Sequence, residues 1–238
     1  MARRPSDKLL AAPPQAKGGR RQQYSSATKR ALVDVAARLF TAHGYAATSL
    51  DAIVAGARVT KGALYHHFTG KQALFEAVFA RVEGDAARRI RAALEGTSDP
   101  WEKALAGLRA FLDVVQEPGY QRVVVQEGPA ILGYERFREQ EERSSYAIVQ
   151  DIVRSVLEAG TLDLDEAMVG IFSRIFFGAM SAAGETVTAA ADPKVAVAQV
   201  ETAITFIISG FRALADNGVQ LPDPSGLLAP GRGEPGAV

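Results

Sequence analysis

The sequence contains no cysteine and only three histidines. Without cysteine, disulfides, thiolate metal sites and thiol redox chemistry are excluded, and the composition is consistent with the cytoplasm. With three histidines, a metal site has few possible ligands. The adjacent pair His66 and His67 would point about 100° apart on a helix, so the two side chains could not easily bind one metal ion. We therefore expect no metal site and no cofactor.

Long apolar runs and enzyme motifs are also missing. No stretch of 18 or more consecutive apolar residues occurs, so we predict no membrane-spanning helix. The first residues include Arg3 and Arg4 but no apolar segment, so a secretory signal is not expected. No G-x-S-x-G, Walker or G-x-G-x-x-G motif is present, and the run YERFREQEER alternates in charge as solvated helix faces do. We predict a cytoplasmic protein with no catalytic residues.

The net charge of zero conceals an uneven distribution. Residues 1–81 carry 13 Lys and Arg against 4 Asp and Glu, whereas the remainder carries 14 against 23. The first third of the chain is therefore suited to binding a polyanion such as DNA. Six of the basic residues lie before Gln22 in a stretch without periodicity, so residues 1–25 are predicted to be a disordered basic arm. Such an arm could enter a minor groove, or it could serve only as a solubilising tail.

Residues 29–68 have the pattern of a helix-turn-helix. Apolar residues recur at helical spacing from Leu32 to Phe40, and the pattern stops at His43 and Gly44, which predicts a helix end there. Thr48 is predicted to cap a second helix, with Asp51 as its capping-box partner. Thr60 is predicted to cap a third helix, so only residues 57–59 turn the chain.

This region resembles the DNA-binding domain of the TetR family of bacterial transcriptional regulators. The resemblance lies in Thr48-Ser49, in Ile53 and in the run Thr60-Lys61-Gly62-Ala63-Leu64-Tyr65-His66-His67-Phe68, and it extends through Lys71, Leu74 and Phe75. About fifty residues are similar in motif, and the rest of the chain is similar in helical layout. One position departs from the pattern: Arg58 stands where many members have glycine, so it must accept a positive φ or the turn must shift.

Candidate DNA contacts follow from these positions. Lys61, at the exposed start of the third helix, has the reach to donate to guanine, and Ala63 could touch a thymine methyl group. The resemblance implies phosphate contacts for Tyr65, His66 and Lys71. Leu64, His67 and Phe68 are expected in the core. The full predicted set is Thr48, Arg58, Thr60, Lys61, Gly62, Ala63, Tyr65, His66 and Lys71.

Beyond Lys71 the sequence is helical nearly throughout. We predict helices over 71–94, 100–116, 120–127, 132–159, 165–190 and 193–215, with the third of these ending at Gly128-Pro129. The predicted organisation is a basic arm over 1–25, a DNA-binding domain over 26–70, a helical ligand-binding and dimerisation domain over 71–217, and a disordered tail over 218–238.

The last two predicted helices are apolar on more than one face. Such helices must contact both their own domain and a second surface, so we predict a homodimer through a four-helix bundle. The alternative is that both helices are buried inside a monomer.

The resemblance also implies a small-molecule effector, largely apolar, held among the later helices. Aromatic residues could line its pocket, although most aromatic residues at helical spacing are simply core. Polar residues within apolar helices are more informative, because a buried charge needs a partner, a ligand or water. The predicted ligand contacts are Trp101, Phe111, Gln126, Tyr134, Phe172, Arg174, Phe176, Met180 and Glu185, with Phe137 and Phe177 as further aromatic candidates.

The sequence therefore predicts an all-α protein, with an N-terminal three-helix helix-turn-helix domain and a C-terminal helical domain that binds ligand and dimerises. Its predicted function is a ligand-responsive repressor that binds a palindromic operator in double-stranded DNA. The alternatives are a transcriptional activator and a DNA-binding architectural protein without a ligand.

Overall fold

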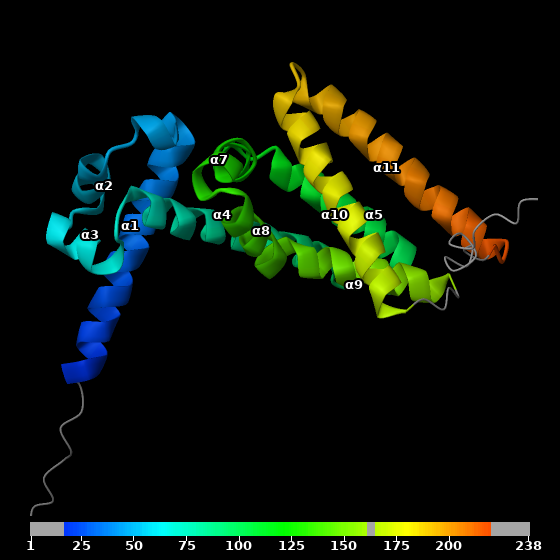
Figure 1. Cartoon of the computed structure of the whole chain (residues 1–238), viewed down its shortest axis with the longest axis horizontal. Helices are drawn as coiled ribbons and strands as arrows, with labels where there is room; N and C mark the ends of the chain where they lie inside the picture. Colours follow the sequence, from blue (N-terminus) through cyan, green and yellow to red (C-terminus); the bar gives the residue numbers. More distant parts are fainter. Residues whose placement is uncertain (1–16, 161–164, 220–238) are drawn as a thin grey trace, which may run out of the picture.

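The computed structural model describes residues 17–160 and 165–219, and the described residues form helices without any strand (Figure 1). The predicted all-α class is confirmed. Residues 1–16 of the predicted arm, and the predicted tail beyond residue 219, lie outside the described residues. The helices, in chain order, are α1 Lys17–Ala47, α2 Leu50–Ala57, α3 Lys61–His67, α4 Lys71–Leu94, α5 Pro100–Val115, α6 Pro118–Tyr120, the π-helix η1 Gln121–Glu127, α7 Gly128–Leu132, α8 Tyr134–Glu141, the π-helix η2 Glu142–Tyr146, α9 Ala147–Ala159, α10 Glu166–Ala189 and α11 Pro193–Asp216.

The first helix differs from its prediction at its start and agrees with it at its end. Residues 17–25 are helical, although they were expected to belong to a disordered arm. Near the other end, Gly44 leaves the helical conformation with φ 77° and ψ 169°, as the glycine after His43 predicts. Helical backbone resumes briefly after this kink and ends at Ala47.

The bounds of the middle helices differ from the predicted ones, and two segments of this region, η1 and η2, are π-helical. The segment over 120–127 does not end at Gly128-Pro129, because η1 runs directly into α7. Pro129 is tolerated there, since a proline at the start of a helix removes an N–H that has no helical partner. The predicted long helix over 132–159 instead begins after Gly133, at φ 76°, and is widened by η2 in its middle.

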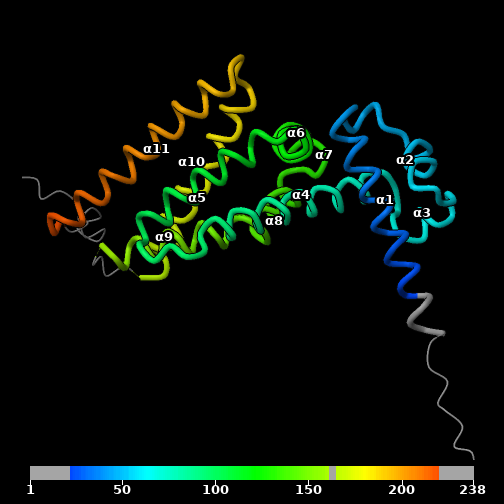
Figure 2. The backbone as a smooth tube through the Cα atoms, turned by 180° about the vertical axis from the view of Figure 1, so that it is seen from behind, coloured from blue at the N-terminus to red at the C-terminus, as the bar shows by residue number. Residues whose placement is uncertain are grey.

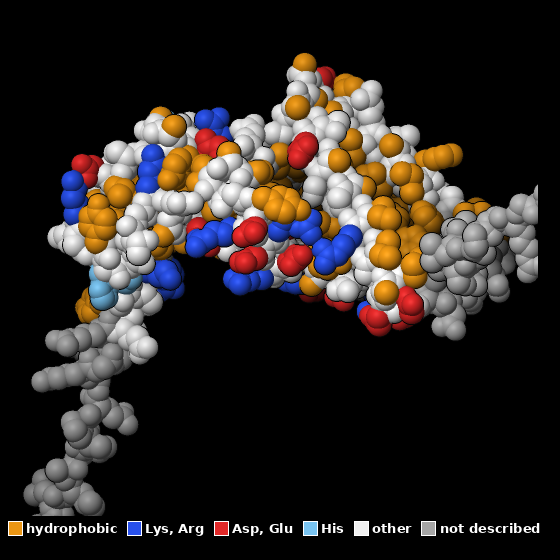
Figure 3. Space-filling view, viewed as in Figure 1, with side chains coloured by type: hydrophobic (Ala, Val, Ile, Leu, Met, Phe, Trp, Pro, Cys, Tyr) orange, Lys and Arg blue, Asp and Glu red, His pale blue; other side chains and the backbone are white. Residues whose placement is uncertain are grey.

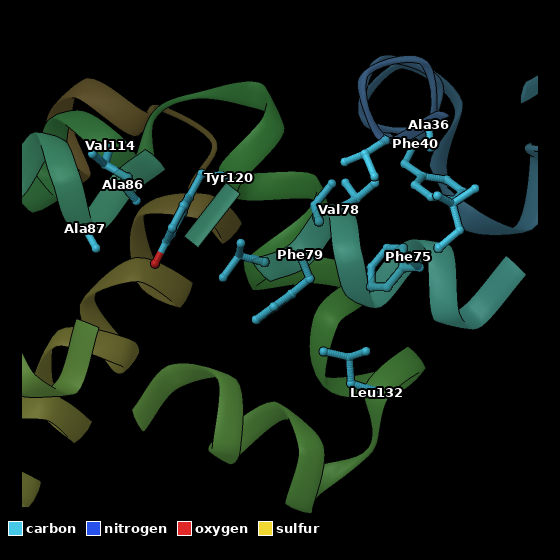
Figure 4. Packing of buried hydrophobic residues seen from close by; sticks show 14 of the residues in the cluster. Ala36, Phe40, Phe75, Val78, Phe79, Ala86, Ala87, Val114, Tyr120 and Leu132 are labelled. Carbon is cyan, nitrogen blue, oxygen red and sulfur yellow. The ribbon is translucent and has the colours of Figure 1, made fainter. Parts of the chain in front are cut away.

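One hydrophobic core joins the N-terminal helices to the rest of the chain through α4. Phe75 on α4 packs edge-on against Phe40 and Tyr45 of α1, with ring centroids 5.4 and 5.3 Å apart. Val78 and Phe79, one turn further along α4, continue this core toward the helices that follow α4 in the chain (Figure 4). Figures 1 and 2 show α4 leading out of the three-helix unit, and further along its length α4 packs against α5 and η2. A displacement of α4 therefore displaces the helices at its start.

The helices α10 and α11 leave much of their apolar surface uncovered. Hydrophobic side chains gather over this end of the molecule (Figure 3). Both helices are long and apolar enough to cross a membrane by length and composition alone, although no uninterrupted apolar run signals this in the sequence. The most exposed large apolar residues on them are Ile171, Ile175, Val195, Phe206, Ile207 and Leu214.

Candidate DNA-binding surface and ligand cavity

The second helix is capped by Ser49, and the prediction that Thr48 caps it is wrong. The Ser49 hydroxyl accepts from the backbone N–H of Ala52. Thr48 is buried, and its hydroxyl donates to the Gly44 carbonyl at 2.7 Å. The side chain of Thr48 therefore fixes the kinked end of α1 and is not placed to bind a phosphate.

The turn between α2 and α3 has the geometry that the sequence required. Arg58 adopts the left-handed conformation, with φ 55° and ψ 42°, and its backbone N–H bonds to the end of α2. Thr60 caps α3 as predicted, accepting from the N–H of Ala63. Leu64 is buried, as is Ile53 on α2, so the turn sets α3 against α2 and leaves the other face of α3 open.

The open face of α3 carries most of the predicted DNA contacts. Thr60, Lys61, Gly62, Tyr65 and His66 are exposed, and so is Arg58 in the turn, whereas Ala63 is half-buried. Tyr65 is 58% exposed, which is unusual for a tyrosine without a partner surface. The exposed groups combine a cation, hydroxyls and an imidazole, which are suitable donors to phosphates and base edges.

Two of the predicted contacts already have partners within the protein. Lys61 forms an ion pair with Asp51 of α2 at 2.7 Å, and this carboxylate raises the pKa of Lys61. Lys71 donates to the Ala46 carbonyl at 3.3 Å and lies 4.3 Å from the centre of the Tyr45 ring. Lys61 is exposed and can exchange its partner for DNA. In the absence of DNA, the Lys71 side chain links the end of α1 to the start of α4.

Three residues on either side of the exposed pair Tyr65 and His66 face inward. Leu64 and Phe68 are buried, as predicted, and His67 is half-buried. Burial lowers the pKa of His67, and the neighbouring His66 and Lys29 add to this effect. Burial and these two neighbours therefore disfavour the charged imidazolium form of His67.

A carboxylate at the end of η1 binds the kinked end of α1. Glu127, at the end of η1, accepts the backbone N–H of Tyr45 on both oxygens, at 2.9 and 3.1 Å. Arg122 donates to the same carboxylate at 3.2 Å. Glycine is favoured at position 44 by its positive φ, and a Cβ there would displace the Arg122 guanidinium and the Glu127 carboxylate that hold this end of the helix.

A cavity of about 370 Å³ lies among α4, α5, α9, α10 and α11, and residues of α6, η1, α7, α8 and η2 complete its wall. Its walls are mainly aromatic and aliphatic, which is typical of small-molecule sites. Gln126 and Tyr134, which the sequence predicts as ligand contacts, do not line the cavity. Both side chains are exposed, because each points away from the interior on its helical turn. The predicted residues that the structure places on its wall are Trp101, Phe111, Phe172, Arg174, Phe176, Met180 and Glu185, together with Phe137 and Phe177.

One side of the cavity is acidic, which the sequence pattern did not reveal. Glu83 on α4 is only 2% exposed, and its Oε2 accepts from the hydroxyls of Ser144 and Ser145 at 2.6 and 2.7 Å. Burial, with a smaller contribution from Glu83, raises the pKa of Glu141 to about 7. Burial and Glu83 also raise the pKa of Tyr120. Among the described residues, no cluster of three or more metal-ligating side chains occurs.

Comparisons with known proteins match both parts of the chain. Residues 32–78 match the model described as bacterial regulatory proteins of the tetR family, and residues 101–211 match the tetracyclin repressor-like C-terminal domain. The crystal structure of a TetR-family transcriptional regulator from Pectobacterium atrosepticum is 26% identical, with a TM-score of 0.69. The match covers 80% of this chain and 96% of that one.

Curated relatives match over shorter lengths. The transcriptional activator FasR of Mycolicibacterium smegmatis is 33% identical over 94 residues, which are 39% of this chain and 43% of FasR. The transposon Tn10 TetC protein of Escherichia coli is 31% identical over 115 residues, which are 48% of this chain and 57% of TetC. The chain thus spans about half the length of these two relatives. With both domain models matched in order, the chain belongs to the TetR family of helix-turn-helix transcriptional regulators.

Proposed function

We propose that this protein is a homodimeric repressor that binds a palindromic operator and releases it when a small molecule occupies the cavity. The observation that carries the proposal is that the segment from α6 to α7 contacts both the cavity and the end of α1. Tyr120, Val124 and Pro129 of this segment lie on the cavity wall, while Glu127 holds Tyr45 beside the helix-turn-helix. A ligand that repositions this wall therefore acts on the DNA-binding helices through a direct hydrogen bond.

We assign DNA binding to residues 26–70, and ligand binding and dimerisation to residues 71–217. The proposed DNA contacts are those exposed on α3 and in the turn before it, with Lys61 reading a base and Tyr65 and His66 binding phosphates. Two copies of α3 can enter successive major grooves on one face of B-DNA only when they lie about 34–36 Å apart. The dimer must therefore hold this spacing to bind.

The proposed dimer interface is the uncovered apolar face of α10 and α11. Phe206 is 80% exposed in the single chain and Ile175 is 62% exposed, so this face is poorly suited to water. The residues that match the C-terminal domain of the family, 101–211, include all of α10 and most of α11, which favours a protein interface over a membrane. We therefore propose a cytoplasmic dimer in which two helices from each copy form a four-helix bundle, with binding as its activity and no catalytic step.

Selection of DNA tests the proposal. Genomic fragments bound by the purified protein should converge on one inverted repeat, whose affinity is then measured by fluorescence anisotropy of the labelled fragment. Specific affinity about 10³-fold or more above that for a scrambled fragment supports an operator-binding regulator. Equal affinity for both fragments contradicts it and favours an architectural protein.

Activation of transcription is the second candidate, and the similarity to FasR, an activator by name, favours it. Both functions use the same DNA contacts. Transcription in vitro from a promoter that carries the selected operator distinguishes them, since a repressor lowers transcript yield and an activator raises it.

A further inference from the structure

The charged residues on the cavity wall leave an excess of negative charge. Arg138 and Arg174 both approach one carboxylate, that of Glu142, at 3.6 and 3.5 Å. Glu141 and Glu185 also line the cavity, and within the described part of the chain neither forms an ion pair. Two carboxylates on the wall therefore have no ion-pair partner among the described residues, and the two arginines on the wall are outnumbered by its three carboxylates.

A buried carboxylate adds to this excess. Glu83 lies behind the wall with its side chain almost fully enclosed, and two serine hydroxyls are its hydrogen-bond donors. Within residues 22–160 and 165–219, no lysine or arginine lies within ion-pair distance of it. One of the two donors, Ser145, is itself part of the cavity wall, as is Tyr120. Hydrogen bonds satisfy a buried carboxylate but do not neutralise it, so a positive charge in the cavity would be stabilised.

The remainder of the wall suits the apolar body of a ligand, and its rings suit a cation. Phe172 and Phe176 of α10 are half-buried beside Phe211 of α11, with ring centroids 6.3 and 5.9 Å apart, and all three line the cavity. Trp101 lines the cavity from α5. Aromatic faces attract organic cations, and they do so most strongly where water is excluded.

We infer that the cavity binds an organic cation, an amine or quaternary ammonium compound with an apolar body, whose positive charge lies beside Glu141 and Glu185. This inference rests on the proposed function, because it names the chemical class of the effector. An anionic ligand is disfavoured, since it would have to take both arginines from Glu142 and lie next to the unpaired carboxylates.

The inference makes ligand affinity depend on pH in a defined direction. Glu141 is faced by Glu83 from α4, by Tyr120 from α6, by Arg138 from its own helix, by Glu142 from η2 and by Glu185 from α10. Because burial and these carboxylates hold the pKa of Glu141 near 7, the residue is largely neutral at pH 6 and ionised at pH 8. The affinity for a cation should therefore rise by up to about tenfold over this range.

The only tryptophan of the chain, Trp101, allows a direct test. Three probes share a phenylalkyl body and differ in their head group: phenylhexyl-trimethylammonium, phenylhexanol and phenylheptanoate. Each is titrated into the full-length protein while Trp101 fluorescence is followed. We expect the ammonium compound to bind at least tenfold more tightly than the other two at pH 8. Tighter binding of the carboxylate, or no binding of the ammonium compound, overturns the inference.

Variants locate the charge that selects the cation. Glu141→Gln should lower the affinity for the ammonium probe about tenfold, leave that for the alcohol unchanged and flatten the pH dependence. Glu139→Gln makes the same change on the exposed side of α8 and is the matched control. Glu185→Gln, at an exposed position, should lower cation affinity in the same direction and tests the second carboxylate independently of the packing around Glu141. Unchanged cation affinity in both cavity variants contradicts the inference.

Operator binding without ligand separates failure of this inference from failure of the proposed function. A protein that binds its operator but prefers the carboxylate probe is still a regulator, with another class of effector. A protein that binds the ammonium compound but no operator has the proposed ligand site without the proposed function.

Discussion

The carboxylate of Glu127 binds the backbone N–H of Tyr45 with both oxygens, at 2.9 and 3.1 Å, across 82 positions of sequence. Tyr45 directly follows the kink of α1 at Gly44, and its ring packs against Phe75 of α4. Glu127 ends η1, whose residues Val124 and Val125 lie on the cavity wall. The contact therefore joins the ligand site to the helix-turn-helix without passing along α4.

Glu127→Ala should uncouple the two sites. The substitution removes a charged acceptor from two hydrogen bonds of Tyr45 and leaves Arg122 unpaired, so we expect a loss of about 1.5–3 kcal/mol in the free energy of unfolding. The change in operator affinity caused by ligand should fall at least tenfold, as measured by anisotropy. Glu139→Ala, at an exposed site on α8, is the control. A full ligand response in Glu127→Ala would show that α4 alone carries the signal.

Lys61→Ala should weaken operator binding by about 1–3 kcal/mol and relax the preference at one base pair of each half-site. The exposed ion pair with Asp51 contributes little to stability, so folding should be unaffected. Tyr65→Phe should weaken binding on all sequences alike, because a phosphate contact carries no base preference. Lys194→Ala removes the same charge from α11 and is the control. Equal operator affinity in Lys61→Ala and wild type would exclude Lys61 as a base contact.

Phe206→Asp should convert the dimer to a monomer. The side chain is 80% exposed in the single chain, and enclosing a phenylalanine contributes about 1.5–3 kcal/mol in each copy. Sedimentation velocity measures the mass, and operator affinity should fall with it. Tyr134→Asp makes a comparable change at an aromatic residue that is 75% exposed on α8, and should leave the dimer intact. A dimeric Phe206→Asp would place the interface elsewhere.

The raised pKa of Glu141 predicts how stability varies with pH. Because the folded-state pKa of about 7 exceeds the ordinary value of 4.5, this carboxyl contributes stability that is fully present below pH 4.5 and is lost as the pH rises through 7. Glu141→Gln should therefore match wild type near pH 5 and have a Tm about 2–4 °C higher at pH 8. This corresponds to about 1 kcal/mol after allowance for solvent screening of a partly exposed group. A Tm difference independent of pH would contradict the assignment.

Ser181→Phe should fill the cavity from α10, where Ser181 lies on the wall. We expect ligand affinity, measured by calorimetry, to fall at least tenfold while operator binding without ligand persists. Ala130→Phe introduces the same ring at an exposed site of α7 outside the cavity. Wild-type ligand affinity in Ser181→Phe would place the ligand elsewhere.

The sequence predicted features that depend on local backbone chemistry. Gly44 ends the first straight part of α1, Thr60 caps α3, and Arg58 accepts the left-handed conformation that the short turn demands. Each of these follows from the conformational range or hydrogen-bonding capacity of a residue and its near neighbours. The prediction that Thr48 caps α2 is wrong because Thr48 and Ser49 are adjacent, and the hydroxyl of either residue could serve as the cap.

Features that depend on tertiary packing could not be predicted in the same way. The sequence predicts a ligand contact for Gln126, yet its neighbour Glu127 is the residue that turns inward, since consecutive helical residues point about 100° apart. The π-helical turns shift this register further, and neither has a local sequence signal. The partnership of Glu83 with Ser144 and Ser145 joins residues about sixty positions apart, so only the folded chain reveals it.

The most direct test of the account is the affinity of the wild-type protein for its selected operator, measured by anisotropy with and without ligand at a concentration that saturates the Trp101 fluorescence change. If occupation of the cavity favours the wrong spacing of the two recognition helices by about 2.7 kcal/mol, operator affinity falls about a hundredfold. The same operator affinity with the cavity full and empty would contradict a ligand-released repressor.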